Sequence, residues 1–191
     1  MIVLVGASAS GKTEVAKLLN VLFNIKKVVT HTTRPIRRSE VRDVDYHFVT
    51  EEEFLRLKDN DSFVETTFYN GNYYGSSKKE IGDDKVLIVD PAGLESFLSL
   101  NNSRIVTFFL EANEKTRFER MLLRGDSIEN AKSRIANDSL KFPEEIKSKV
   151  NYVIDSEHLT LLDMTQKVYE LYTNHLKEIW CISYGSLENI L

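Results

Sequence analysis

Short apolar runs alternate along the chain with longer segments whose apolar residues recur at helical spacing. The apolar runs have the length of buried strands and occupy residues 2–5, 27–29, 85–90, 105–110 and 150–154. Helical patterns follow them, as in Val15, Leu19 and Phe23 after the first run. Strands separated by helices are typical of a parallel sheet with helices on its faces. We therefore predict an α/β fold with a three-layer, parallel-sheet core.

Residues 30–84 have a different pattern, dominated by alternation. An alternating stretch, a capping box and a short helical pattern come first, at residues 45–49, 50–53 and 51–57. Two further strand patterns, 63–68 and 72–75, flank Asn70-Gly71, which is a strong hairpin signal. We expect a small β-rich insertion in the parallel core.

The second half of the chain is mainly helical. We expect helices at residues 113–125, 128–140 and about 160–178, the first of them opened by Asn113 and stopped by Gly125. The remaining tail, residues 179–191, is apolar. We expect the tail to pack against the domain or against a second subunit, because exposed apolar segments are unfavourable in water.

Length and composition indicate one folding unit. The chain has 191 residues, of which 42% are hydrophobic and 28% charged, enough for one well-cored domain with inserted segments. We divide it into a core, an insertion, a lid and a tail. These are residues 1–29, 85–119 and 142–178 for the core, 30–84 for the insertion, about 120–141 for the lid and 179–191 for the tail.

Charge and cysteine content exclude several classes of function. A net charge of −4 provides no basic surface for nucleic acid. Cys181 is the single cysteine and the four histidines lack ligand spacing, so we expect neither a disulfide framework nor a cysteine-based zinc site. No apolar run approaches the roughly 18 residues of a membrane span. We expect a cytoplasmic protein without nucleic-acid or membrane partners.

The stretch between the first strand and the first helix carries recognisable chemistry. Its pattern is G-x-x-x-x-G-K-T, made by Gly6, Ala7, Ser8, Ala9, Ser10, Gly11, Lys12 and Thr13. The glycines let successive N–H groups point inward, and the following helix adds its positive N-terminal end. Lys12 can then reach the β- and γ-phosphates, and the Thr13 hydroxyl is placed to ligate Mg²⁺. The pattern predicts a nucleotide site.

Arginines form two further groups. Arg34, Arg37 and Arg38 lie in a segment of threonines and proline that suits an ordered loop, and guanidinium groups suit phosphate. A solvated basic surface is the alternative for this segment. Arg120 and Arg124 share a helix face, where their like charges oppose each other unless an anion lies between them. Phosphate is a suitable anion.

Two acidic residues have alternative interpretations. Asp90 ends an apolar strand, where an acid in a nucleotide-binding sheet lies near the metal, but it can equally cap the helix that Pro91 opens. Glu65 lies in the middle of a strand, where it either faces solvent or contacts a ligand. Tyr74 and Ser76 likewise either pack within the hairpin or contact a ligand, and a tyrosine in a hairpin commonly serves packing.

Taken in order, these features resemble the guanylate kinases from the phosphate loop to about Asp155. The matching segments are the loop ending in Gly11-Lys12-Thr13, T-T-R-x-x-R-x-x-E at 32–40, Asp45-Tyr46-x-Phe48, Phe63-Val64-Glu65, Gly71-Asn72-Tyr73-Tyr74-Gly75-Ser76, Arg120, Arg124-Gly125 and Arg134. The resemblance implies a P-loop NTPase core with a nucleotide-monophosphate-binding insertion and a helical lid. It also implies ATP-dependent phosphorylation of GMP with Mg²⁺, by a monomer or homodimer.

The resemblance further implies roles for individual residues. The GMP phosphate would be held by Arg34, Arg37, Tyr46 and Tyr74, and the guanine side of the pocket would include Thr30, Glu65 and Ser76. The ATP phosphates would lie on the loop from Gly6 to Thr13, with Thr13 and Asp90 near the metal. The transferring phosphoryl group would be contacted by Lys12, Arg120, Arg124 and Arg134.

Three positions depart from the family pattern. Ile88 replaces a usual Asp, Ala92 replaces a usual Gln, and Asp155 replaces a usual Asn. These departures leave open a sister kinase that acts on another phosphorylated acceptor. The alternative from another class is a non-catalytic interaction module of guanylate-kinase type. Such modules typically lose the loop lysine, whereas this chain retains Lys12.

Overall fold

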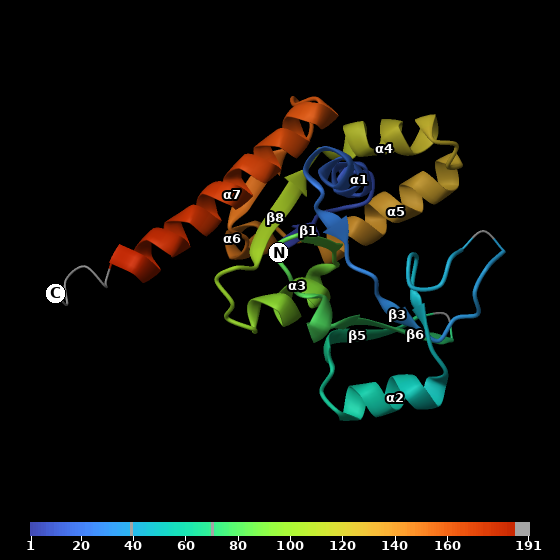
Figure 1. Cartoon of the computed structure of the whole chain (residues 1–191). Helices are drawn as coiled ribbons and strands as arrows, with labels where there is room; N and C mark the ends of the chain where they lie inside the picture. Colours follow the sequence, from blue (N-terminus) through green and yellow to red (C-terminus); the bar gives the residue numbers. More distant parts are fainter. Residues whose placement is uncertain (39, 70, 186–191) are drawn as a thin grey trace.

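A five-stranded parallel sheet forms the centre of the molecule in the computed structural model, which describes residues 1–38, 40–69 and 71–185 (Figure 1). Its strand order is β2-β7-β1-β8-β9, and the four pairings that join these strands are parallel. The strands are β1 (Ile2–Val5), β2 (Lys26–Lys27), β7 (Lys85–Ile88), β8 (Val106–Glu111) and β9 (Tyr152–Asp155). The predicted α/β parallel core is therefore confirmed.

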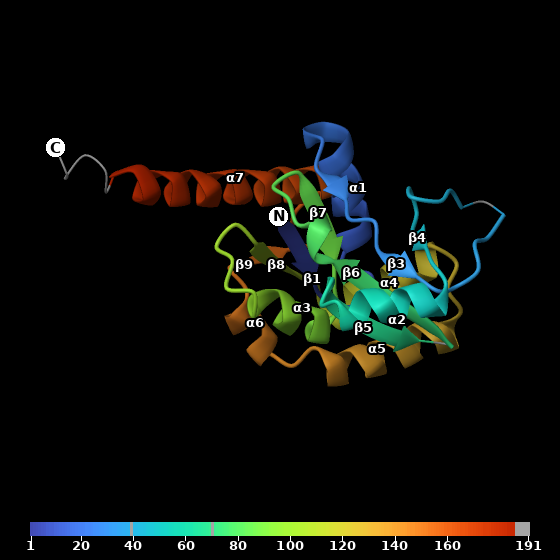
Figure 2. The ribbon, with the colours of Figure 1, turned by 60° about the horizontal axis from the view of Figure 1, so that its bottom comes forward.

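Helices cover both faces of this sheet (Figure 2). They are α1 (Lys12–Phe23) and α7 (Leu161–Gly185) on one face, and α3 (Pro91–Leu98) and α6 (Glu145–Lys149) on the other. Along β1, Ile2 and Leu4 pack toward α1 and α7, whereas Val3 and Val5 pack toward α3 and α6. Burial on both sides explains why the strand is apolar throughout and does not alternate.

A second sheet lies between β2 and β7 in the chain, where the β-rich segment was predicted. Its strand order is β4-β3-β6-β5. Its elements are β3 (His31–Thr32), β4 (His47–Phe48), α2 (Glu51–Asp59), β5 (Phe63–Tyr69), β6 (Asn72–Ser77) and the 3₁₀ turn η1 (Lys78–Glu80). The antiparallel pairing of β5 with β6 confirms the predicted hairpin. The start of α2 is confirmed at Thr50, the first residue of the predicted capping box, because its hydroxyl accepts the N–H of Glu53 at 3.1 Å.

Three predicted strands are too long. The stretch 45–49 is extended only at His47 and Phe48, because a turn precedes it in which Asp43 has a φ of 63° and donates its N–H to the Tyr46 carbonyl. The stretch 27–29 is represented by β2, which ends at Lys27. The stretch 85–90 is represented by β7, which ends before Asp90 turns the chain into α3.

The helices predicted at residues 113–125 and 128–140 are confirmed as α4 (Glu114–Leu123) and α5 (Ile128–Lys141). Each begins at a side chain that accepts a backbone N–H: Asn113 accepts that of Thr116, and Ser127 accepts that of Asn130. Gly125 lies between the helices with a φ of 93°, which favours glycine. Local sequence signals therefore set both ends of α4 and the start of α5.

The predicted end of the last helix near Glu178 is wrong, because α7 continues to Gly185 and its final turns extend away from the core (Figures 1 and 2). The side chains of Trp180 and Cys181 are exposed, so this part of the predicted tail does not bury itself in the domain. Residues 186–191 lie outside the described part of the chain. Within the described residues, no helix combines the length and apolar character that crossing a membrane requires.

Candidate active site

The phosphate loop joins β1 to α1, in the context that its sequence predicts. Gly6 has a φ of +147°, and a Cβ at this position would lie 2.6 Å from the carbonyl oxygen of Leu110 on the neighbouring strand. Gly11 has a φ of +97° and forms the N-terminal cap of α1. Both positions require glycine, the first because of close packing against β8 and the second because of its backbone conformation.

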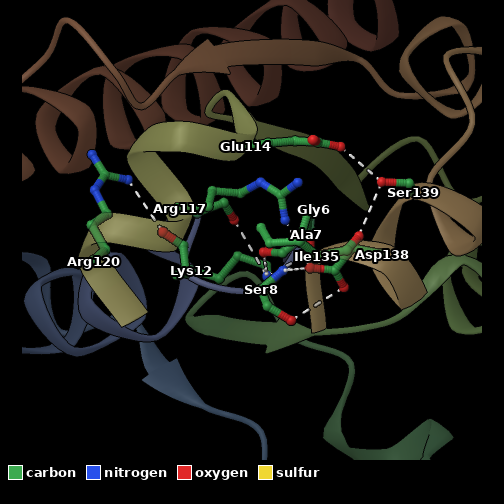
Figure 3. Close-up of polar contacts among 12 residues, drawn as sticks. Gly6, Ala7, Ser8, Lys12, Glu114, Arg117, Arg120, Ile135, Asp138 and Ser139 are labelled. Carbon is green, nitrogen blue, oxygen red and sulfur yellow. Dashed lines mark hydrogen bonds and ion pairs between the residues drawn. The ribbon is translucent and has the colours of Figure 1, made fainter. Parts of the chain in front are cut away.

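Lys12 lies folded over this loop (Figure 3). Its Nζ donates to the carbonyl oxygens of Gly6 at 2.6 Å and Ala7 at 2.7 Å, and to the hydroxyl of Ser10 at 3.3 Å. Burial lowers the pKa of Lys12 to about 8, and the negative charge of Asp138 opposes this shift. The lysine is thus a partly desolvated cation whose interaction with an anion in the loop is strengthened by the local environment.

Two lid arginines line a cavity in front of the loop. The cavity has a volume of about 460 Å³ and is bordered by Ala9, Gly11, Lys12, Thr13, Glu14, Arg120, Arg124, Leu159, Leu161 and Met164. Arg120 is anchored by donating to the Ser156 hydroxyl at 2.9 Å and to the Ala9 carbonyl at 3.3 Å. Arg124 donates to Asp126 at 2.6 Å. The cavity combines cations and backbone donors for phosphate with an apolar wall suitable for a ring.

Arg134 is not brought to this cavity in the described structure. It lies exposed on α5 and does not appear in the cavity lining; the pKa of Asp126 is lowered mainly by the hydrogen bond from Arg124, and the charge of Arg134 adds to this effect. Sequence reasoning also missed Ser156, which fixes Arg120, and Met164, which lines the apolar wall. Neither residue carries a motif, and only the fold places them beside the loop.

The loop after β3 gathers a second group of phosphate-compatible side chains. Arg34 donates from Nη2 to Glu40 at 2.6 Å, and its guanidinium lies 5.5 Å from the ring centre of Tyr46. Tyr46 and Tyr74 are in edge contact, with ring centres 6.3 Å apart, and Tyr74 also hydrogen-bonds Arg34. Glu40 also accepts the backbone N–H of Arg37 at 2.8 Å.

These contacts favour an ordered loop over a solvated basic surface at Arg34. The hydrogen bond to Glu40 raises the pKa of Arg34, and the same bond lowers the pKa of Glu40. The side chain of Arg34 is 13% exposed. Arg37, in contrast, is exposed on the same loop.

Glu65 and Ser76 face each other across the hairpin. The Ser76 hydroxyl donates to Oε1 of Glu65 at 2.6 Å, and Ser76 is buried. Burial raises the pKa of Glu65, the bond from Ser76 opposes this, and the charge of Asp90 adds to the rise. Thr30 precedes β3, where its carbonyl accepts the N–H of His47 at 2.9 Å. Glu65 is therefore a half-buried carboxylate with an oxygen left to accept donors from a ligand.

Asp90 is the N-terminal cap of α3, where Oδ1 accepts the N–H of Gly93 at 2.9 Å. The helix-cap interpretation of this residue is confirmed. Among the described residues, no group of three or more His, Cys, Asp or Glu side chains could hold a metal. Thr13 is exposed and borders the 460 Å³ cavity in front of the phosphate loop, here called the donor cavity. A single hydroxyl at this place fits a Mg²⁺ ion that is held chiefly by nucleotide phosphates and water.

A phosphate loop between β1 and α1 of a parallel sheet, with the helices α4 and α5 and an inserted second sheet, defines a kinase of the P-loop class. The family profile described as guanylate kinase matches residues 1–172. The chain belongs to the guanylate kinase family.

Individual relatives agree with this assignment. The chain is 35% identical over 156 residues to a guanylate kinase of Fusobacterium nucleatum, covering 78% of this chain and 83% of the relative. It is 32% identical over 173 residues to one of Chlamydia felis, covering 86% and 80%.

Among solved structures, guanylate kinase from Anaplasma phagocytophilum has a TM-score of 0.64 at 25% identity, with 91% of this chain and 84% of that chain covered. A gluconokinase from Sinorhizobium meliloti has a TM-score of 0.57 at 12% identity, and the match covers 95% of this chain and 96% of that chain. It shares the fold.

Proposed function

We propose that the protein transfers the γ-phosphoryl group of ATP to GMP, giving ADP and GDP. The observation that carries this proposal is the presence, in one member of the guanylate kinase family, of both a complete phosphate loop and the Glu65–Ser76 pair on the insertion. The loop suits a nucleoside triphosphate, and the pair suits a base that presents adjacent donors.

On the donor side, the backbone from Gly6 to Thr13 holds the ATP phosphates. Thr13 would hold Mg²⁺ through its hydroxyl, and Asp90 is the second candidate contact to the ion. The metal would neutralise charge on the β- and γ-phosphates. Lys12 stabilises the negative charge that grows on the bridging oxygen as the bond breaks, and its position over the phosphate loop supports this role.

On the acceptor side, Arg34, Arg37, Tyr46 and Tyr74 hold the phosphate of GMP. The cluster of Arg34 with the two tyrosines supports this role, since it presents a fixed cation and two hydroxyl groups. Glu65 and Ser76 recognise guanine, with Thr30 beside them. Holding both substrates in line is the main requirement of phosphoryl transfer, which needs no covalent group on the protein.

The lid supplies the remaining positive charge. Arg120 and Arg124 already border the cavity at the phosphate loop, and Arg134 would reach it through a movement of α5. Their charges would stabilise the equatorial oxygens of the transferring group, and closure would exclude water that could hydrolyse ATP.

The alternative within the same class is a kinase that phosphorylates another phosphorylated acceptor. Ile88 and Ala92 favour it, because they remove polar groups next to Asp90. The non-catalytic module is disfavoured by the retained Lys12 and Thr13 and by the ordered Arg34.

A coupled assay of ADP release across GMP, dGMP, AMP, UMP and CMP tests the proposal. We expect turnover with GMP and dGMP and little with the others, because only guanine offers two adjacent donors to Glu65. Turnover with another acceptor but not with GMP would support the alternative kinase, and absence of turnover with all five would support the module.

We further propose a cytoplasmic enzyme, monomeric or homodimeric, whose partners are its small-molecule substrates. The single cysteine and the net charge of −4 support this view, since they favour a reducing compartment and provide no general surface for nucleic acid.

A further inference from the structure

A buried ion pair joins the two lid helices beside the phosphate loop. Arg117 of α4 and Asp138 of α5 are 5% and 7% exposed, and Nη1 of Arg117 lies 2.8 Å from Oδ2 of Asp138. Neither residue has a role in the proposed chemistry. Apolar residues of similar size often stabilise a fold as well as a buried ion pair does, so the stability of the lid alone does not account for the pair.

The carboxylate of this pair also binds the phosphate loop (Figure 3). Oδ2 of Asp138 accepts the backbone N–H of Ser8 at 2.9 Å, and Oδ1 accepts the Ser8 hydroxyl at 3.2 Å. Backbone N–H groups of such a loop are the donors that hold phosphate. While Asp138 holds Ser8, this donor is unavailable to a phosphate oxygen, and the carboxylate, although paired with Arg117, places negative charge directly against the loop.

The geometry of the pair leaves it able to rearrange. Nε of Arg117 is buried and has no hydrogen-bond partner among the residues described. For comparison, the surface residue Arg104 donates to Asp83 from two nitrogens, Nε and Nη2, whereas Arg117 donates to Asp138 from Nη1. A cavity of about 620 Å³ is lined in part by Ala7, Arg117 and Asp138, so the carboxylate has room to leave Ser8.

We propose that Asp138 acts as an internal anion, which holds Ser8 of the phosphate loop while no nucleotide is bound. When ATP binds, one of its phosphate groups displaces the Asp138 carboxylate from Ser8. Displacement breaks the contact between α5 and the loop. Arg134 lies one helical turn from Asp138 on the same face of α5, so the movement releases the segment that carries this arginine. Binding of the donor is thereby linked to lid movement, and Arg134 stays away from the donor cavity until ATP arrives.

The proposal rests on ATP being the donor and is tested by binding alone. Mg²⁺–ATP is titrated calorimetrically, without an acceptor, into wild type and Asp138→Asn. Asparagine keeps the shape and removes the charge, so we expect ATP to bind about three- to tenfold more tightly. Unchanged or weaker binding by the folded variant would overturn the proposal, because a residue that merely stabilised the loop could not strengthen binding when altered.

Glu114→Gln is the matched control. Glu114 lines the same cavity and accepts a bond from Ser139 at 2.8 Å, but none of its described hydrogen bonds reaches the loop. We expect its ATP affinity to equal that of wild type. If ATP bound more tightly by the same factor to both variants, the loss of any negative charge near the cavity would explain the change. That result would contradict a specific role for the contact with Ser8.

A double variant covers the case in which Asp138→Asn leaves an unpaired buried arginine that prevents folding. Arg117→Met with Asp138→Leu replaces the pair by apolar side chains, a change that is often neutral or stabilising. We expect ATP binding at least as tight as in wild type, and weaker binding would overturn the proposal. In turnover, the KM for ATP should fall while that for GMP stays constant. Tight ATP binding without phosphorylation of GMP would instead contradict the proposed function.

Discussion

Single charged side chains carry most of the proposed chemistry, and their surroundings differ in a way that matches their roles. Lys12 is held over the loop by two backbone carbonyls and is partly desolvated. Glu65 is half-buried against Ser76. A low local dielectric strengthens the interaction of Lys12 with an anionic ligand and that of Glu65 with hydrogen-bond donors of a ligand.

Lys12→Met should nearly abolish turnover while the protein stays folded. Methionine keeps the length of the side chain but cannot stabilise charge on the phosphates, a loss that commonly costs about a hundredfold or more in kcat. Steady-state kinetics with circular dichroism for folding is the measurement. Turnover within tenfold of wild type in a folded variant would remove Lys12 from the catalytic group.

Arg34→Ala should raise the KM for GMP far more than the KM for ATP. The guanidinium is ordered beside Tyr46 in the insertion, so its loss removes a contact of the acceptor alone. Arg38→Ala is the control from the same loop and should change neither constant. Equal changes in both KM values for Arg34→Ala would mean that the residue is structural.

The KM for GMP should depend on pH through Glu65. Because burial raises the pKa of Glu65, this carboxyl takes up a proton at a higher pH than an ordinary glutamate does. Protonation removes an acceptor for guanine, so the KM for GMP should rise as the pH falls through that raised pKa. Glu65→Gln should lose this part of the pH profile, since the remaining titration belongs to GMP. If the KM for GMP had the same pH dependence in wild type and in Glu65→Gln, a role for Glu65 would be contradicted.

At the scale of elements, the sequence predicted most of the fold because local signals were strong. The apolar run before Gly6, the Thr50 capping box and the Asn70-Gly71 hairpin each correspond to an observed element. The end of α7 was missed because the apolar tail suggested a separate segment. No glycine or proline interrupts the helix before Gly185, and that is the signal that could have placed its end.

The candidate site was predictable only where motifs carry it. Lys12, Arg34 and Glu65 lie in recognisable patterns, whereas Asp138 meets Ser8 only through the packing of α5 against the core. Contacts between residues so distant in the chain leave no local periodicity to read. The cap role of Asp90 was one of two interpretations, and the structure shows this role through its bond with the Gly93 N–H.

Removing residues 179–191 should leave the kinetic constants unchanged within about twofold. The site contacts of α7 come from its first turn, around Met164, which lies roughly 22 Å along the helix from residue 179 at 1.5 Å per residue. We expect changes in solubility or association, because Trp180 is 56% exposed. Light scattering and turnover are the measurements, and a soluble, folded but inactive truncation would show a site role for this segment.

At the scale of the whole molecule, the core sheet holds the phosphate loop, Arg120 and Arg124 border the cavity beside it, and further candidate residues lie on the inserted sheet. Arg34 and Glu65 belong to the segment of the second sheet, and Arg120 and Arg124 belong to α4 and the residue after it. Phosphoryl transfer depends on alignment of donor and acceptor, so movement of these elements over the loop would complete the site. The contact of Asp138 with Ser8 would make that movement depend on the donor.

The ratio of kcat/KM for GMP to that for AMP tests the central claim most directly. A half-buried carboxylate that accepts two donors from guanine is left unpaired by adenine, so we predict a ratio of at least about a thousandfold. The measurement uses wild-type protein, saturating Mg²⁺–ATP and ADP release for both acceptors. Use of AMP as readily as GMP would contradict the guanylate kinase account, even though a P-loop kinase would remain.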